Sequence, residues 1–223
     1  MKQLFILGNW KSNKTIAEAA SWKEQFSGLV SSVPSSVTLI LCPAFHHLGV
    51  FTGSLPYALG VQDLSPFERG AYTGELSASM VEENVTYALL GHSERRKYFG
   101  ETDEIIAEKV KQAMAHAIRP IVCVSDVSQA EALKLLVPDF STTGMLLYEP
   151  LFAIGSGKSD SPQNANATAK TISDVLSVPI LYGGSVVAEN VRGFTDQEYL
   201  SGVGVGGASL DASKFHALIQ AVL

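Results

Sequence analysis

The sequence predicts an α/β protein built as a (β/α)₈ barrel, with eight parallel strands in a single domain over residues 1–223. Eight short apolar runs recur along the chain, separated by segments with the patterns of helices or loops. Most runs are continuously apolar, which is typical of parallel strands covered on both faces. Polar or glycine residues follow their carboxyl ends, where a barrel assembles its chemistry. A doubly wound open sheet is the alternative arrangement.

Each predicted element has a local reason. The apolar runs interpreted as strands span 3–10, 37–43, 57–63, 86–92, 119–125, 144–150, 178–184 and 202–207. The first helix is expected after Thr15, which forms a capping box with Glu18. Later helix starts are marked by Ser93, by Thr102, by Ser128 with Glu131, by Ser161 before Pro162, and by Asp211.

Composition narrows the class of protein. The chain has 223 residues, 46% of them apolar, which is enough for one large core. Its net charge of −6 argues against nucleic acid or an anionic membrane as a partner. Cys42 and Cys123 lie in apolar runs without metal-ligand spacing, which suits buried thiols in a reducing compartment. The apolar run near the N-terminus is too short for a signal peptide. We therefore expect a soluble cytoplasmic protein without a metal ion or cofactor.

Glu149 is the strongest candidate for a catalytic base. It follows an apolar strand and precedes Pro150, which favours an extended conformation, so Glu149 ends the strand instead of entering a helix. A carboxylate among apolar neighbours at the barrel mouth can act as a general base. The alternative is an ordinary surface glutamate.

Three further side chains follow other strands and are expected at the same mouth. His92 lies where a helix begins, and the positive end of the helix dipole favours a neutral imidazole that can donate a hydrogen bond. Lys11 would offset negative charge on a substrate, with Asn9 beside it as a neutral donor. Taken alone, Lys11 is better explained as a solvated lysine.

Glycine-rich segments come late in the chain, at 155–157, 183–185 and 206–207. Glycine lets backbone N–H groups approach an oxyanion closely, and barrels often bind phosphate after strands seven and eight. The segment after strand seven lacks the G-x-G-x-x-G spacing of a dinucleotide site. A base, a neutral donor, an ammonium and a phosphate site together suit proton abstraction next to a carbonyl in a small phosphorylated molecule.

Six segments, in order, resemble the signature segments of the triosephosphate isomerase family. They are GNWKSN (8–13), GAYTGELSA (70–78), GHSERR (91–96), YEPLFAIGSGK (148–158), YGGSV (182–186) and VGGASL (205–210). The resemblance implies a TIM barrel that interconverts dihydroxyacetone phosphate and glyceraldehyde 3-phosphate through an enediolate.

The resemblance also implies residue roles. Glu149 would move a proton between two carbons, His92 would polarise the carbonyl, and Lys11 with Asn9 would stabilise negative charge. Supporting contacts are implied for Ser93, which would hold Glu149 at rest, and for Glu94, which would pair with Lys11. The implied phosphate-binding residues are Gly155, Ser185, Gly206 and Gly207.

Two loops complete the implied enzyme. The lid that excludes water would consist of Pro150, Leu151, Phe152, Ala153, Ile154, Ser156, Gly157 and Lys158. The 65–79 loop would enter a neighbouring subunit of a homodimer, with Thr73 reaching the partner's site. If it were only a surface loop, Phe67 and Tyr72 would be left exposed.

The sequence departs from the family pattern in four places. It is about 30 residues shorter than a typical barrel of this type, mostly after strand five. Ser125 and Asp126 replace a usual Gly-Glu pair, which puts a structural ion pair in doubt. Phe152 replaces a usual tryptophan and is expected to keep an aromatic hinge contact. Gly204 stands where a large aliphatic residue normally packs over the glutamate, so we expect Glu149 to be poorly covered and Gly204→Leu to raise turnover.

Two other functions remain open from the residues. An aldolase could use Lys11 as a Schiff base, although the acidic Glu94 nearby argues against a neutral amine. An idle barrel could serve as a binding or assembly module, but it would be expected to lose Glu149, His92 or Lys11, and all three are present.

Overall fold

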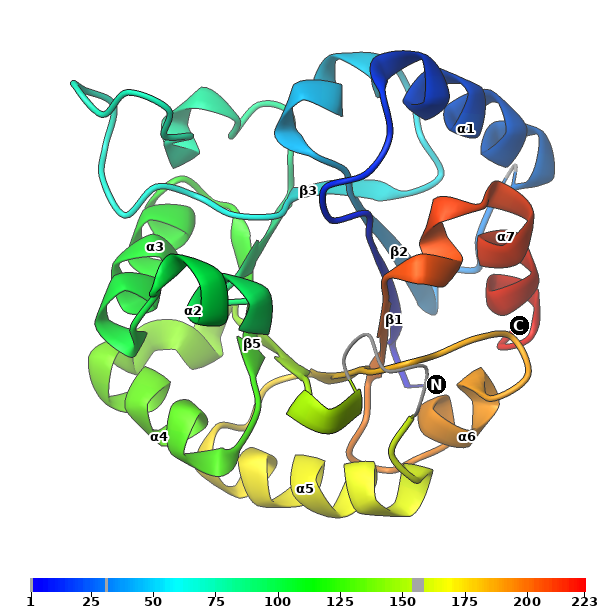
Figure 1. Ribbon diagram of the computed structural model, residues 1–223. Coiled ribbons are helices and arrows are strands. Elements are labelled where there is room, and N and C mark those ends of the chain that lie inside the picture. Colours follow the sequence, from blue (N-terminus) through cyan, green and yellow to red (C-terminus); the bar gives the residue numbers. More distant parts are fainter. Residues whose placement is uncertain (1, 31, 154–158) are drawn as a thin grey trace.

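The computed structural model describes residues 2–30, 32–153 and 159–223, and it shows a closed barrel of eight parallel strands. The strands follow one another in chain order, and β1 pairs with β8, so the open-sheet alternative is wrong. Figure 1 looks onto the carboxyl ends of the strands, with the helices arranged around them. The strands are β1 (Leu4–Asn9), β2 (Val37–Cys42), β3 (Ala58–Val61), β4 (Tyr87–Leu90), β5 (Arg119–Val124), β6 (Met145–Tyr148), β7 (Ile180–Gly183) and β8 (Gly202–Val205).

The strands are buried on both faces, which explains their continuous apolar runs. In β6, Met145 and Leu147 belong to the cluster inside the barrel. Leu146 and Tyr148 point the other way and belong to the cluster that packs against the helices. Residues two apart on a strand therefore share a face, and the residues that follow the strands continue this alternation into the barrel mouth.

Helices cover most of the outer surface. The α-helices are α1 (Ile16–Leu29), α2 (Ser93–Phe99), α3 (Asp103–Ala115), α4 (Val127–Leu136), α5 (Pro162–Val175), α6 (Val191–Thr195) and α7 (Ala212–Gln220). The short 3-10 helices are η1 (Phe45–Val50), η2 (Ala78–Met80), η3 (Pro138–Thr142), η4 (Leu151–Ala153) and η5 (Gly207–Leu210). No helix of the described residues is long and apolar enough to cross a membrane.

Most of the predicted helix starts are confirmed. Thr15 and Glu18 form the capping box of α1, and the side chains of Thr102, Ser161 and Asp211 cap α3, α5 and α7. Each cap satisfies a backbone N–H group that the first turn leaves without a partner inside the helix.

Two predicted starts are wrong by one or two residues. The N-cap of α2 is His92, and Ser93 is its first helical residue. The N-cap of α4 is Asp126 rather than Ser128, because its carboxylate accepts hydrogen bonds from Ser128 Oγ at 2.6 Å and from the Gln129 N–H at 3.1 Å. The bond from Ser128 is the main reason that the pKa of Asp126 is lowered. Asp126 therefore acts as a helix cap here.

The connection between β5 and β6 is short, as expected. It contains only α4 and η3, within residues 125–144. Leu133 and Phe140 are nevertheless buried against the main core, so the shortened segment still covers this side of the barrel.

A buried ion-pair cluster lies beside the barrel mouth. Lys109 on α3 is 3% exposed and contacts both Asp63 and Glu101. Arg95 on α2 also contacts both carboxylates. Burial raises the pKa of Asp63 although Lys109 opposes that shift. The cluster joins the segment after β3 to helices α2 and α3.

A surface cluster at the end of α3 makes stability depend on pH. The His116 ring contacts Glu82 and, at 3.4 Å, Glu68. The hydrogen bond to Glu82 is the main cause that raises the pKa of His116 above 6.5. The stabilisation is therefore complete below the unfolded-state pKa and disappears as pH rises through the higher folded-state pKa.

We expect His116→Asn to lower the free energy of unfolding at pH 6 by less than about 1 kcal/mol, because the pair is near the surface. At pH 9 the same substitution should have almost no effect. Thermal unfolding of both proteins at the two pH values measures this, and an equal loss at pH 6 and pH 9 would contradict it.

Candidate active site

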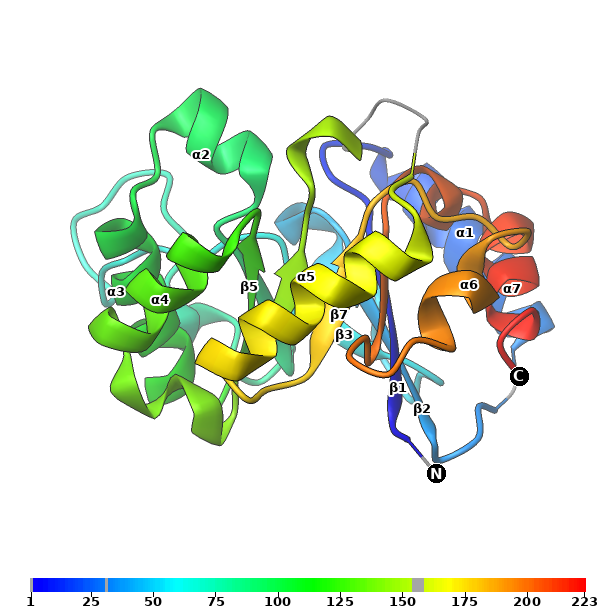
Figure 2. The same ribbon diagram turned by 90° about the horizontal axis from the view of Figure 1, so that it is seen from below.

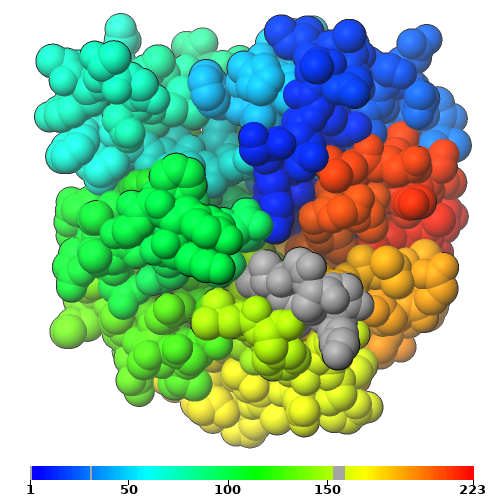
Figure 3. Space-filling view, viewed as in Figure 1, coloured from blue at the N-terminus to red at the C-terminus, as the bar shows by residue number. Residues whose placement is uncertain are grey.

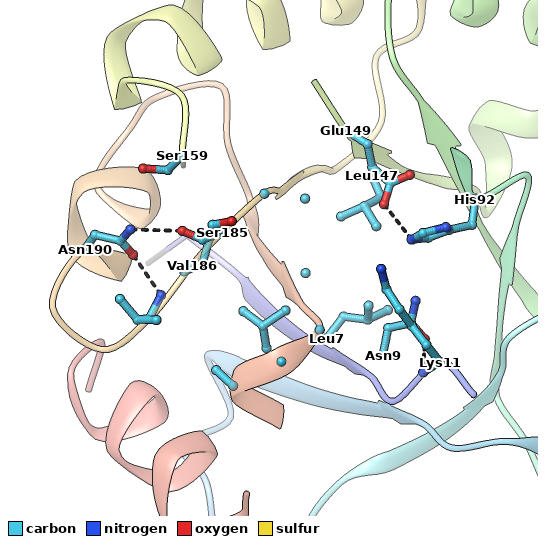
Figure 4. A pocket seen from close by; sticks show the side chains of 18 residues that line it. Leu7, Asn9, Lys11, His92, Leu147, Glu149, Ser159, Ser185, Val186 and Asn190 are labelled. Atoms are coloured by element: carbon cyan, nitrogen blue, oxygen red, sulfur yellow. Dashed lines mark hydrogen bonds and ion pairs between the residues drawn. The ribbon is translucent and has the colours of Figure 1, made fainter. Parts of the chain in front are cut away.

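A pocket of about 410 Å³ opens at the carboxyl ends of the strands. Figure 2 shows this end of the barrel at the top, together with α2 and the segment after β6. The pocket is lined by residues that follow or end β1, β4, β6, β7 and β8. In Figure 4, Asn9, Lys11, His92 and Glu149 lie on one side, and Ser185 with Asn190 on the other.

Glu149 lies at the barrel mouth, and the residue as a whole is 4% exposed. Its backbone N–H donates to Val124 O at 2.8 Å, which extends the pairing of β6 with β5 by one residue. Its Oε2 accepts from the Ser93 N–H at 3.2 Å, and its Oε1 lies 3.1 Å from His92 Nε2. The carboxylate is thus held between α2 and the imidazole.

The protonation of His92 follows from its hydrogen bonds. Its Nδ1 accepts from the Glu94 N–H at 3.2 Å, so that nitrogen carries no proton. The Glu94 carboxylate is 3.5 Å from Nδ1, which is too long for a good hydrogen bond. The proton of the neutral ring therefore lies on Nε2, the atom that faces Glu149 and the pocket.

Lys11 adopts an uncommon backbone conformation, with a φ of +52°. Its N–H donates to Asn9 Oδ1 at 3.0 Å, and its carbonyl accepts from Gln62 Nε2 at 2.9 Å. Its ammonium contacts Glu94 Oε1 at 2.6 Å, as the resemblance implied. These three contacts fix both ends of Lys11 and place its charge at the pocket.

Cys123 is a buried thiol on β5. Burial, and secondly the negative charge of Glu149, raise the pKa of this thiol well above its usual value. Cys123 therefore stays protonated.

The other side of the pocket has the features of a phosphate site. Gly206 and Gly207 line it at the start of η5, where helical N–H groups have no partner within the helix. Ser185 lines it after β7, and Asn190 holds that loop by donating to Ser185 O at 3.1 Å and accepting from the Val187 N–H at 2.9 Å.

Comparison with known proteins agrees with this geometry. The family model described as triosephosphate isomerase matches residues 4–222. The chain belongs to the triosephosphate isomerase family. A triosephosphate isomerase of Caldanaerobacter subterraneus subsp. tengcongensis is 39% identical over 250 aligned residues, covering 99% of this chain and 100% of the relative. The triosephosphate isomerase of Gloeobacter violaceus is 37% identical over 99% of both chains, and that of Dehalococcoides mccartyi is 36% identical over 99% of this chain and 97% of its own.

Several residues that the family resemblance singled out cannot be placed. Gly155, Ile154, Ser156, Gly157 and Lys158 lie outside the described residues. Before them, Pro150 is buried, and Leu151, Phe152 and Ala153 form η4.

The expected hinge contact of Phe152 stays a prediction. Phe152 is 62% exposed, and its ring packs against no other aromatic ring in the described part of the chain. Thr73 is exposed in the 65–79 loop and does not line the pocket of its own chain.

Sequence reasoning missed three residues of this triosephosphate isomerase family site. Gln62 follows β3 and donates hydrogen bonds to the carbonyls of Lys11 and Cys42. Asn190 shapes the loop after β7 from within a helix start. Leu147 lines the pocket, but nothing in a continuously apolar strand distinguishes one leucine from the next.

The expectation that Gly204 leaves Glu149 poorly covered is wrong, because Glu149 is 4% exposed. The space beside Gly204 is filled by the Leu147 side chain, whose Cδ1 would lie 2.7 Å from a Cβ added at 204.

Among the described residues, no group of three potential metal ligands comes together.

Proposed function

We propose that this protein interconverts dihydroxyacetone phosphate and D-glyceraldehyde 3-phosphate through an enediolate, as an enzyme of glycolysis and gluconeogenesis. The observation that carries the proposal is the contact between Glu149 and the Nε2 of a neutral His92 in one pocket with Lys11. A base, a neutral hydrogen-bond donor and a cation next to a phosphate site are what this proton transfer requires.

In the proposed reaction, Glu149 removes the proton from the carbon next to the carbonyl, and the C–H electron pair forms the enediolate. His92 Nε2–H donates to the carbonyl oxygen and helps exchange the hydroxyl proton between the two oxygens. Glu149 then returns a proton to the neighbouring carbon. Lys11 and Asn9 stabilise the negative charge that develops on oxygen.

The contacts of Glu149 describe a resting arrangement. Its two carboxylate oxygens face the Ser93 N–H and His92 Nε2, and the substrate carbonyl would take over the second contact. Glu149 would therefore have to turn toward the substrate carbon when substrate binds. The resemblance assigns phosphate binding to Gly155, Ser185, Gly206 and Gly207. It assigns water exclusion to the lid residues within 150–158.

The aldolase alternative is disfavoured by the same geometry. Lys11 Nζ is 2.6 Å from Glu94 Oε1, and this ion pair keeps the nitrogen as an ammonium without a free electron pair. A coupled assay that follows glyceraldehyde 3-phosphate formed from dihydroxyacetone phosphate tests the isomerase directly. Lack of conversion by the folded protein would contradict it, and borohydride-trapped substrate on Lys11 would favour the aldolase.

We propose that the active form is a homodimer formed through the 65–79 loop. The loop projects from the barrel at the upper left of Figures 1 and 3. It carries Phe67 and Tyr72, which stack at 4.4 Å yet are 47% and 45% exposed. Phe45 and Met80 add exposed apolar surface from η1 and η2. Thr73 would then reach the partner's site.

Sedimentation equilibrium at micromolar concentration should give twice the mass of one chain. Replacing Phe67 and Tyr72 together by serine should give monomers that keep the barrel's circular dichroism. A monomeric wild-type protein would contradict the dimer.

A cytoplasmic location completes the proposal. It is supported by Cys42 and Cys123, which are buried free thiols. Burial raises the pKa of Cys42 to about 12, so it stays protonated.

A further inference from the structure

The inner wall beside Glu149 comes from a different strand than the family resemblance led us to expect. Leu147 precedes Glu149 by two residues, so both side chains point into the barrel. Leu147 is 3% exposed and lines the same pocket. Figure 4 shows its side chain directed into the pocket next to Glu149.

Two neighbouring glycines make room for Leu147. Gly183 on β7 is paired in register with Gly204 on β8. A Cβ added at Gly183 would lie 3.0 Å from both Glu149 Cγ and Leu147 Cγ. The two side chains therefore pack around the same point of the β7 backbone.

The position of Gly204 shows how far the leucine reaches. A Cβ added there would lie 2.7 Å from Leu147 Cδ1 and 3.3 Å from its Cδ2. Real Cβ atoms essentially never approach a neighbour to 2.7 Å, so any side chain at 204 would displace Leu147. Leu147 and a residue at 204 thus compete for one volume.

We propose that Leu147 is a positioning residue of this site: its side chain is the apolar wall that holds Glu149 and excludes water from its carboxylate. The proposal rests on the proposed isomerase function. An apolar wall limits the orientations that the carboxylate can adopt, and a general base works only within reach of the proton that it removes. His92 and the Ser93 N–H contact the two carboxylate oxygens.

The first test is Leu147→Ala. We expect kcat at pH 7 to fall about tenfold while KM changes by less than about twofold, because Leu147 acts on the base and not on the substrate. A second measurement does not need activity. In protein labelled with ¹³C at the glutamate carboxyls, the Glu149 signal, assigned by its loss in Glu149→Gln, should move from its wild-type chemical shift at pH 7, because water reaches the carboxylate.

The second test uses the shared volume. Gly204→Leu alone should lower Tm, because two leucines cannot occupy the space. The double variant Leu147→Ala with Gly204→Leu should be more stable than either single variant. It should also return the Glu149 signal toward its wild-type chemical shift and bring kcat to within about threefold of the wild-type value.

Two control variants separate positioning from general packing. Leu181 is the register partner of Leu147 on β7, belongs to the same interior cluster and does not line the pocket. Leu181→Ala should lower Tm without changing kcat or the chemical shift of the Glu149 signal. Leu147→Met keeps the volume and should behave like the wild type. If Leu147→Ala does not fold, Leu147→Met is compared with Leu147→Val instead. Leu147→Val should change kcat and the Glu149 signal in the same direction as expected for Leu147→Ala, but by less.

The outcomes are distinct. If folded Leu147→Ala, or folded Leu147→Val where Leu147→Ala does not fold, keeps the wild-type chemical shift of the Glu149 signal, the proposal is overturned. It is also overturned if the double variant is no more stable than Gly204→Leu. If the wild type lacks isomerase activity but the Glu149 signal moves as expected, the proposed function fails while the assignment of Leu147 as the wall stands.

Discussion

Glu149→Gln is expected to lower kcat/KM for dihydroxyacetone phosphate by about 10³-fold, within the range of a positioned general base. The amide keeps the size of the side chain and can still lie near His92 and the Ser93 N–H. It cannot take up a proton, so the step that forms the enediolate loses its base. The coupled assay under saturating and limiting substrate measures kcat and KM separately.

A matched control makes this result readable. Glu131 lies exposed on α4, away from the residues that line the pocket. Glu131→Gln should leave kcat/KM within about twofold of the wild type, because Glu131 does not line the pocket. It should also leave the fold intact, since exposed substitutions rarely change the free energy of unfolding by more than about 0.5 kcal/mol. Activity of Glu149→Gln within tenfold of the wild type would contradict the role of Glu149 as the base.

Lys109→Met is expected to have the largest effect on stability. It removes the buried ammonium that contacts Asp63 and Glu101 and leaves two carboxylates with too little positive charge. Breaking a buried ion pair typically costs 3–5 kcal/mol, and Arg95 still contacts both acids, so we expect about 3 kcal/mol. For a chain of this size that lowers Tm by about 6–12 °C.

The control is the next lysine on the same helix. Lys111 pairs with Glu108 at the surface, with a side chain that is 48% exposed. Lys111→Met should change the free energy of unfolding by less than about 0.5 kcal/mol. Urea unfolding of the wild type, Lys109→Met and Lys111→Met measures the free energy of unfolding of each. Equal values for the two variants would contradict the expected contribution of the buried cluster to stability.

Much of the barrel was predictable because its signals are local. Continuous apolar runs marked the eight strands, and short polar side chains marked most of the helix starts. The errors at Ser128 and Ser93 have one cause. Several residues that can cap a helix stand close together, and only the turn geometry selects Asp126 and His92.

The polar part of the site was predictable for a similar reason. A parallel barrel brings all carboxyl strand ends to one mouth, so Lys11, His92 and Glu149 had to meet there. Leu147 was not predictable, because its task depends on the missing side chains of Gly183 and Gly204 on two other strands. The sequence motif around Glu149 does not indicate that arrangement.

The reaction run in D₂O tests the central claim most directly. If Glu149 exchanges its proton with solvent while the enediolate exists, dihydroxyacetone phosphate should give glyceraldehyde 3-phosphate that carries deuterium at carbon 2, as measured by NMR. Glu149→Gln should form this product about 10³-fold more slowly. Conversion by Glu149→Gln at the wild-type rate, with deuterium incorporated at carbon 2 as in the wild type, would contradict the account.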